Sequence, residues 1–223
     1  DFLASMSHEI RTPMAGVLGM AELLGNTSLT HEQKQYLETM QDSSRSLLDI
    51  INQILDMSKI EANRLELEVI DFRLEAVVED AIKVFYARRQ HTPVRIETLL
   101  DPLTPAILQG DPTRLRQVLI NLIGNAYKFT EKGSITLSVR QEGSQKIHFA
   151  IIDTGPGIAE SALNRIFEHY GQETASTART HGGTGLGLSI CKQLVTLMGG
   201  EIGVQSQPGA GTMKHTRQAL AEL

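Results

Sequence analysis

Residues 111–130 read DPTRLRQVLINLIGNAYKFT, and this stretch decides most of the predicted fold. Its apolar residues recur at steps of three and four, which indicates an amphipathic helix. Asp111 suits the N-cap position, and Pro112 suits the first helical position because no N–H is needed there. The stretch therefore predicts a capped helix that packs one face against a core.

Three polar residues share one face of this predicted helix. Asn121, Asn125 and Lys128 follow one another at spacings of four and three residues, which places them on the same side. Carboxamide oxygens suit a partly hydrated Mg²⁺, and a lysine suits phosphate oxygens. The solvated side of an ordinary amphipathic helix has the same appearance, so the spacing alone leaves both interpretations open.

The chain after about residue 66 mixes helix and strand patterns. Helical periodicity runs through residues 75–85, 160–170 and 186–200. Strand patterns cover residues 94–100, 134–141, 146–153 and 201–207. This grouping predicts an α+β sandwich in which one sheet packs against a helical layer.

Before residue 66 the pattern is heptad-like instead. One stripe comprises Leu3, Met6, Ile10, Met14, Val17, Ala21 and Leu24, and a second comprises Leu37, Met40, Ser44, Leu47, Ile51, Ile54 and Ser58. Thr30 followed by Gln33 fits a capping box at the start of the second helix. A two-helix hairpin cannot cover so long a stripe, so we expect a second copy to complete a dimeric four-helix bundle.

Two glycine-containing segments adjoin predicted elements. IIDTGPGI (151–158) puts Asp153 at the end of an apolar strand, and HGGTGLGLSI (181–190) puts four glycines directly before a helix. Such glycines let backbone N–H groups approach an anion near a helix N-terminus. A plain structural turn is the alternative for each segment. Neither matches the P-loop or the spaced glycines of a dinucleotide fold.

The segment SMSHEIRTPM (5–14) lies on the first predicted helix. A zinc site of the HExxH type would need histidine at position 12, where the chain has Thr12. With the apolar stripe on the helix seam, His8 falls on the solvent-facing side, as a simply solvated histidine or an accessible nucleophile does. Pro13 cannot donate to the carbonyl of Glu9, so we expect a kink there.

Composition limits the classes of function. The 223 residues are 41% hydrophobic and 21% charged, with a formal net charge of −5, so the chain lacks a broad basic field for nucleic acid. No apolar run approaches the ~20 residues of a membrane span. The chain begins in a helical pattern, as we expect of a fragment excised from a longer protein. Its only cysteine, Cys191, excludes an intramolecular disulfide and is expected to be a buried helix residue.

In this order and spacing, NLIGNAYKFT, DTGPGI, FEHYGQ and GGTGLGLSI resemble the N, G1, F and G2 boxes of sensor histidine kinases, and SMSHEIRTP resembles their H box. The variant is most similar to the hybrid kinases of bacterial two-component systems. The resemblance implies a dimerisation and histidine-phosphotransfer hairpin over residues 1–65. It implies a Bergerat-fold ATP-binding domain, with a mixed sheet against a helical layer, over residues 66–223. It also implies the cytoplasmic portion of a sensor that reaches the inner membrane only through other parts.

The resemblance assigns nucleotide-binding roles motif by motif. Asn125 would hold Mg²⁺, Asn121 would support the nucleotide–metal site, and Lys128 would meet phosphate. Asp153 would accept a hydrogen bond from the adenine amino group. The other implied contacts are Gly155 and Gly157 beneath the base, Phe167 beside a lid at residues 169–182, and Gly183, Gly185, Leu186 and Gly187 at the phosphates.

The resemblance makes His8 the phosphoacceptor, with Glu9 as the general base or the residue that fixes the ring tautomer. ATP and Mg²⁺ are the implied cofactors. The implied partners are a second copy of the chain and a response-regulator receiver domain, whose aspartate takes the phosphoryl group. Thr12 is implied to place water for dephosphorylating that partner, which would make the protein bifunctional.

Two other hypotheses stay open. The end of the chain, MKHTRQALAEL (213–223), lacks the alternation of a closing strand and indicates a short helix or a tail. This end and the unusual residues of the F box keep open a regulatory kinase-like module that binds or dephosphorylates another sensor kinase and has little or no autokinase activity. A gyrase- or Hsp90-like ATPase would account for the nucleotide motifs but leaves the histidine hairpin without a purpose.

Overall fold

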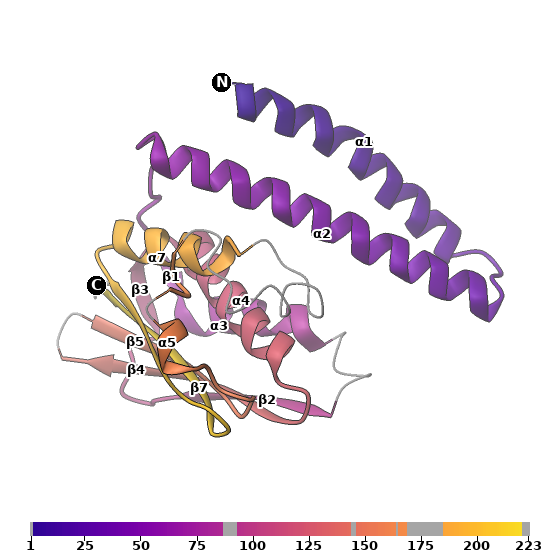
Figure 1. Cartoon of the computed structure of the whole chain (residues 1–223). Coiled ribbons are helices and arrows are strands. Elements are labelled where there is room, and N and C mark those ends of the chain that lie inside the picture. Colours follow the sequence, from indigo (N-terminus) through magenta and orange to yellow (C-terminus); the bar gives the residue numbers. More distant parts are fainter. Residues whose placement is uncertain (1, 87–92, 144–145, 164, 169–184, 220–223) are drawn as a thin grey trace. The chain divides into compact units, whose positions relative to one another are not determined.

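The computed structural model describes the backbone of residues 2–86, 93–143, 146–163, 165–168 and 185–219, and within these ranges the side chains of residues 9–217. The chain forms two compact units, Asp1–Leu65 and Glu66–Leu223 (Figure 1). Among the described residues, no helix combines the length and the apolar character that crossing a bilayer requires.

The first unit is a helical hairpin of α1 (Phe2–Gly25) and α2 (His31–Glu61), which lie side by side (Figure 1). The predicted capping box at Thr30 is confirmed: its hydroxyl accepts from the Gln33 N–H at 3.2 Å, and the Gln33 side chain accepts from the Thr30 N–H at 2.9 Å. This reciprocal pair satisfies two N–H groups that a helix start otherwise leaves unpaired.

The apolar stripe of the hairpin is only partly buried within a single copy. Ala21, Leu37 and Ser44 are buried, whereas Val17 and Ile54 keep 41% and 42% of their surface exposed. The exposed stripe residues also include Leu24, Met40 and Leu47. One hairpin therefore leaves several residues of its apolar stripe uncovered.

The second unit has a five-stranded mixed sheet in the order β2-β4-β5-β7-β6. The strands are β2 (Val94–Leu100), β4 (Gly133–Glu142), β5 (Lys146–Asp153), β7 (Gly211–Ala219) and β6 (Glu201–Gln207). The β2–β4 pair is parallel, and every other pair in this sheet is antiparallel. The predicted class, a mixed sheet against helices, is confirmed.

Three helices form the layer on one face of the sheet: α3 (Leu74–Tyr86), α4 (Pro112–Phe129) and α7 (Gly187–Leu197) (Figure 1). The central helix α4 contacts both other helices as well as β4 and β5. Its buried residues are Leu115, Val118, Leu119, Leu122, Ile123 and Ala126, each 0% exposed. At about 1.5–3 kcal/mol for a large apolar side chain, this face is a major contributor to the core.

The start of α4 has the predicted cap. Asp111 Oδ1 accepts from the Arg114 N–H at 3.0 Å, and Pro112 occupies the first turn. The second oxygen of Asp111 accepts from the Glu68 N–H at 3.1 Å. The carboxylate of Asp111 therefore caps the helix and also connects it by a hydrogen bond to the first residues of the second unit.

Three short elements differ from the sequence-based expectation or were missed by it, and the longer strand β7 is a further difference. The helix expected over residues 160–170 is shorter, because α5 covers only Glu160–Leu163 and a turn follows. The patterns also missed β1 (Ile70–Arg73) and β3 (Ile107–Gly110), which form a two-stranded antiparallel sheet. Strands of four residues are too short to show a clear alternation.

The expectation of a helix or tail after residue 213 is wrong, because β7 lies between β5 and β6 and pairs with both. Its inward-facing residues are Thr212, Lys214 and Thr216, all buried and all polar. A hydrophobicity pattern cannot detect such a strand. The two neighbouring strands nevertheless supply its backbone hydrogen bonds, whatever the side chains are.

The capping box provides a direct test of the hairpin. Thr30→Ala removes the acceptor for the Gln33 N–H, and we expect it to lower the free energy of unfolding by about 1 kcal/mol. Thr39→Ala makes the same chemical change inside the same helix, at an exposed position, and is expected to cause no loss because alanine favours helix. Urea unfolding followed by helical circular dichroism measures both, and equal losses would contradict the capping role.

Candidate functional site

The histidine segment lies within α1. His8, Glu9 and Thr12 all belong to this helix, and the helix continues through Pro13. Glu9 and Thr12 have exposed side chains, whereas the side chain of His8 lies outside the described residues. Positions 8 and 12 are four residues apart, so they share one face of the helix.

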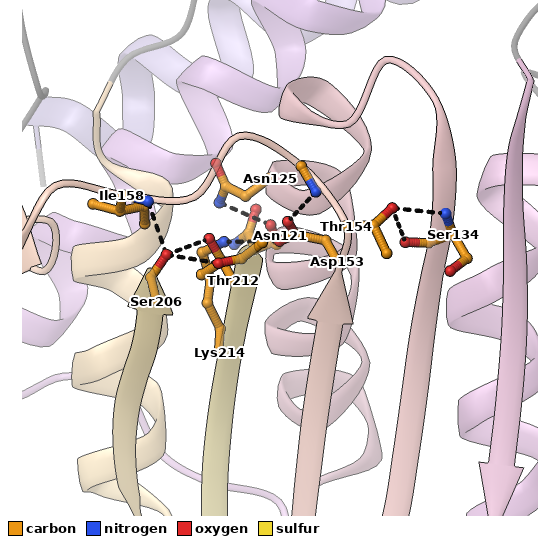
Figure 2. A network of polar contacts seen from close by, with 11 residues as sticks. Asn121, Asn125, Ser134, Asp153, Thr154, Ile158, Ser206, Thr212 and Lys214 are labelled. Atoms are coloured by element: carbon orange, nitrogen blue, oxygen red, sulfur yellow. Dashed lines mark hydrogen bonds and ion pairs between the residues drawn. The ribbon is translucent and has the colours of Figure 1, made fainter. Parts of the chain in front are cut away.

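Asn121 and Asn125 lie one helical turn apart on α4, and Asn121 is close to the start of α7. The Asn125 Nδ2 group donates to the Asn121 carbonyl oxygen at 2.9 Å, as Figure 2 shows. Using the NH₂ end in this way leaves the Asn125 carboxamide oxygen as the group that a cation would meet. A Cβ placed on Gly187 would lie 3.6 Å from Asn121 Oδ1, so the first residue of α7 closely approaches this amide.

The lysine of the same helix face is partly removed from water. Burial lowers the pKa of Lys128 below its ordinary value. Its ammonium lies 5.0 Å from the centroid of the Phe129 ring, within the range of a cation–π contact. A partly desolvated ammonium interacts more strongly with an anion than a fully hydrated one, so Lys128 suits a phosphate oxygen.

Cys191, on α7, is a structural residue. It is fully buried, as expected, and burial raises the pKa of its thiol to about 12, although a hydrogen bond with Asn121 counteracts part of this rise. Its Sγ lies 3.9 Å from the Val118 carbonyl oxygen of α4. A thiol that stays protonated is a poor nucleophile, so Cys191 helps to join α7 to α4 and takes no part in chemistry.

Asp153 ends β5 and has a buried carboxylate. Its side chain is 5% exposed; Oδ1 accepts from the Gly155 N–H at 3.0 Å, and Oδ2 lies 3.8 Å from Lys214 Nζ (Figure 2). The sequence analysis missed Lys214. Lys214 stands at an inward-facing position of the strand, which is an unusual place for a lysine. This can be recognised only once residues 211–219 are known to be a strand.

The loop after Asp153 is packed against the turn between β6 and β7. The Ile158 N–H donates to Ser206 Oγ at 2.8 Å, and the Gly209 N–H donates to the Pro156 carbonyl at 2.7 Å. Gly157 has φ +76, and a Cβ there would collide with the Gln207 carbonyl oxygen. At Gly155 a Cβ would come within 3.0 Å of Asp153 Oδ1. Gly157 is therefore required by close backbone packing, and Gly155 is tightly packed.

The start of α7 offers backbone donors. Gly185 has φ +70, Leu186 is the buried N-cap residue and makes no side-chain cap hydrogen bond, and Gly187 begins the helix. An uncapped helix N-terminus presents N–H groups and a favourable dipole to an anion. Phe167 is half-buried in the turn after α5. Gly183 and the expected lid at residues 169–182 lie outside the described residues.

The donor set fits a nucleotide with a hard metal ion. Amide oxygens on α4, the ammonium of Lys128 and the N-terminus of α7 suit phosphates and Mg²⁺, and α4 contacts β5, which ends in Asp153. Among the side chains that the structure describes, no cluster of three or more His, Cys, Asp or Glu could hold a metal ion. A zinc-type centre is therefore not formed by these residues.

Comparison with known proteins agrees with this geometry. Residues 1–63 match the His Kinase A (phospho-acceptor) domain, and residues 110–219 match the histidine kinase-, DNA gyrase B- and HSP90-like ATPase family. The chain is 44% identical over 216 residues to sensor histidine kinase GacS of Pseudomonas protegens. It is 42% identical over 216 residues to signal transduction histidine-protein kinase BarA of Escherichia coli.

These matches cover most of this chain and a small part of the relatives. Each alignment includes 95% of the chain and 24% of the relative, so the chain spans about a quarter of their length. The crystal structure of full-length ShkA in complex with AMPPNP superposes with a TM-score of 0.80 at 36% identity, covering 99% of this chain and 46% of that one. With both domains matched in order, the chain belongs to the sensor histidine kinases.

Proposed function

We propose that the chain is an ATP-dependent protein-histidine kinase core that phosphorylates its own His8 and then passes the phosphoryl group to an aspartate of a receiver domain. The observation that carries the proposal is the meeting of α4 and α7, where Asn121 Oδ1 lies 3.6 Å from a Cβ placed on Gly187. A helix N-terminus close to an amide side chain suits a metal-bound polyphosphate.

In this proposal the residues of the second unit hold the substrate. Asn125, supported by Asn121, would be the ligand of Mg²⁺, which neutralises phosphate charge when bound. Lys128 meets a phosphate oxygen, and Asp153 accepts from the adenine amino group. The remaining assignments are Gly155 and Gly157 beneath the base, Phe167 beside the lid, and Gly183, Gly185, Leu186 and Gly187 at the phosphates.

The proposed reaction takes place on the imidazole of His8. A ring nitrogen forms a bond to the γ-phosphorus while the bond from that phosphorus to the bridging oxygen breaks, and ADP leaves. Glu9, the exposed neighbour of His8, takes the ring proton or holds the productive tautomer. Most of the rate enhancement in such a transfer comes from positioning and charge neutralisation.

We also propose that residues 1–65 dimerise and that residues 66–223 are the catalytic ATP-binding domain. The uncovered stripe of α1 and α2, with Val17, Met40, Leu47 and Ile54 all exposed by more than 40%, supports association with a second copy. The regulatory-module hypothesis relied partly on an irregular chain end. Because β7 is a regular strand inside the sheet, that reason no longer applies.

Phosphate labelling tests the central claim. Incubation with Mg-ATP is expected to give an acid-labile, base-stable phosphate on the chain, and His8→Gln is expected to abolish it because no acceptor nitrogen remains. His31→Gln is the matched control, since His31 is an exposed histidine of α2. Equal labelling of the His8 variant means that another residue is the acceptor. Calorimetry that detects no ATP binding, together with absent labelling, supports the regulatory module instead.

Thr12 tests a second, dephosphorylating activity. Its exposed hydroxyl lies one helical turn after His8, where it can orient a water toward a phosphorylated partner. We expect Thr12→Ala to slow the loss of phosphate from a phosphorylated receiver domain at least tenfold and to change ATP labelling of His8 by less than about fivefold (one helix-surface hydroxyl costs about 1 kcal/mol or less). Unchanged dephosphorylation would exclude this role for Thr12.

Two glycines provide a matched test of the nucleotide loop. Gly157 and Gly209 both have positive φ, +76 and +79, but only a Cβ at Gly157 meets other atoms, those of Gln207 and Pro208. Alanine at either position costs about 1–2 kcal/mol in backbone strain. We expect Gly157→Ala to cost more in thermal unfolding and to weaken ATP binding at least tenfold in calorimetry. If both variants lose the same thermal stability and the same ATP affinity, the loop tolerates displacement by the added Cβ.

A further inference from the structure

The most unusual charged residue of the second unit is Lys214, in the middle of β7. It is 4% exposed, although lysine is rarely buried in proteins. In the sheet register it lies opposite Ile151 of β5 and Val204 of β6. Its side chain faces the same way as the buried Thr212 and Thr216, because alternate residues of a strand share a face.

Burying an ammonium is costly unless an anion accompanies it. Desolvation lowers the pKa of Lys214, and the Asp153 carboxylate opposes this shift. Lys214 Nζ lies 3.8 Å from Asp153 Oδ2, and each side chain is 5% exposed (Figure 2). The two residues therefore form a buried ion pair whose charges compensate each other.

The two oxygens of Asp153 face donors from two different segments. Oδ1 accepts from the Gly155 N–H at 3.0 Å, and Oδ2 faces Lys214 at 3.8 Å. The loop after β5 thus holds one edge of the carboxylate, and the neighbouring strand β7 holds the other. Rotation of the carboxylate would give up one of these contacts, so the pair fixes its plane.

We propose that Lys214 is a positioning residue that keeps the Asp153 carboxylate correctly oriented to accept a hydrogen bond from the 6-amino group of adenine. This inference rests on the proposed assignment of Asp153 to the base. Without the lysine, the Gly155 N–H is the remaining contact that holds the buried carboxylate, which can then turn away from the position of the base. Such a rotation weakens it as an acceptor there.

The test compares two nucleotides on the whole chain. ATP carries the 6-amino group, and purine riboside triphosphate carries hydrogen at the same carbon. A hydrogen bond to a charged group makes the wild-type chain bind ATP about 10- to 100-fold more tightly. Asp153→Asn, which removes the carboxylate, is expected to reduce this ratio to near one. We expect Lys214→Met to reduce the ratio at least fivefold, although Lys214 does not itself contact the nucleotide.

The ratio of the two nucleotide affinities does not change when a variant only loses stability. Leaving the carboxylate of Asp153 unpaired is expected to destabilise the fold, but an unfolded fraction weakens both apparent affinities by the same factor. Thr216→Val is the matched control: Thr216 is the next inward-facing residue of β7, fully buried, and its hydroxyl has no hydrogen-bond partner among the described residues. It should keep the wild-type ratio.

The possible outcomes distinguish the proposed role of Lys214 from the assignment of Asp153 to the base, on which that role depends. If Lys214→Met keeps the wild-type preference for ATP over purine riboside triphosphate while Asp153→Asn loses it, the proposed role of Lys214 is wrong. The contact between Asp153 and the base then still holds. A reduced ratio in Thr216→Val also overturns it, because any change within β7 would then have the same effect. No preference in the wild-type chain overturns the base contact and this inference together, while labelling of His8 remains a separate result.

Discussion

The packing of α4 against the sheet is the contact on which both the core and the site depend. Its apolar face, with Leu119 and Ile123 fully buried, holds the helix against β4 and β5. The same helix carries Asn121 and Asn125 on another face, so the burial that stabilises the unit also sets the direction of the two amides. A shift of α4 along its axis would move the core contacts and the amides together.

Sequence patterns predicted α4 well because its determinants are local. The cap residue Asp111, the proline after it and the apolar spacing all lie within one continuous stretch, and each favours the same helix. The capping box of α2 was predictable for the same reason. The short strands β1 and β3 were missed because pairing between segments about 35 residues apart defines them, and neither has enough residues to show a period.

The packing of the candidate site was only partly predictable from the sequence. Glycines before α7 and after β5 indicated close backbone packing, but the sequence could not distinguish Gly157, which faces Gln207, from Gly209, which faces open space. β7 was missed for a stronger reason. A buried Lys214 makes physical sense only with the carboxylate of Asp153, which lies 61 positions earlier in the chain. Here a contact between residues distant in the chain, and not the local hydrophobicity pattern, explains the residue.

Asp153 links these two lessons. Its backbone ends β5, its Oδ1 holds the loop at Gly155, and its charge compensates Lys214. A carboxylate used only for structure would be replaceable, together with its lysine, by apolar residues of similar volume at little cost or even with a gain in stability. A buried pair at the end of a strand that α4 contacts is therefore consistent with the proposed role of Asp153 as the acceptor for the base.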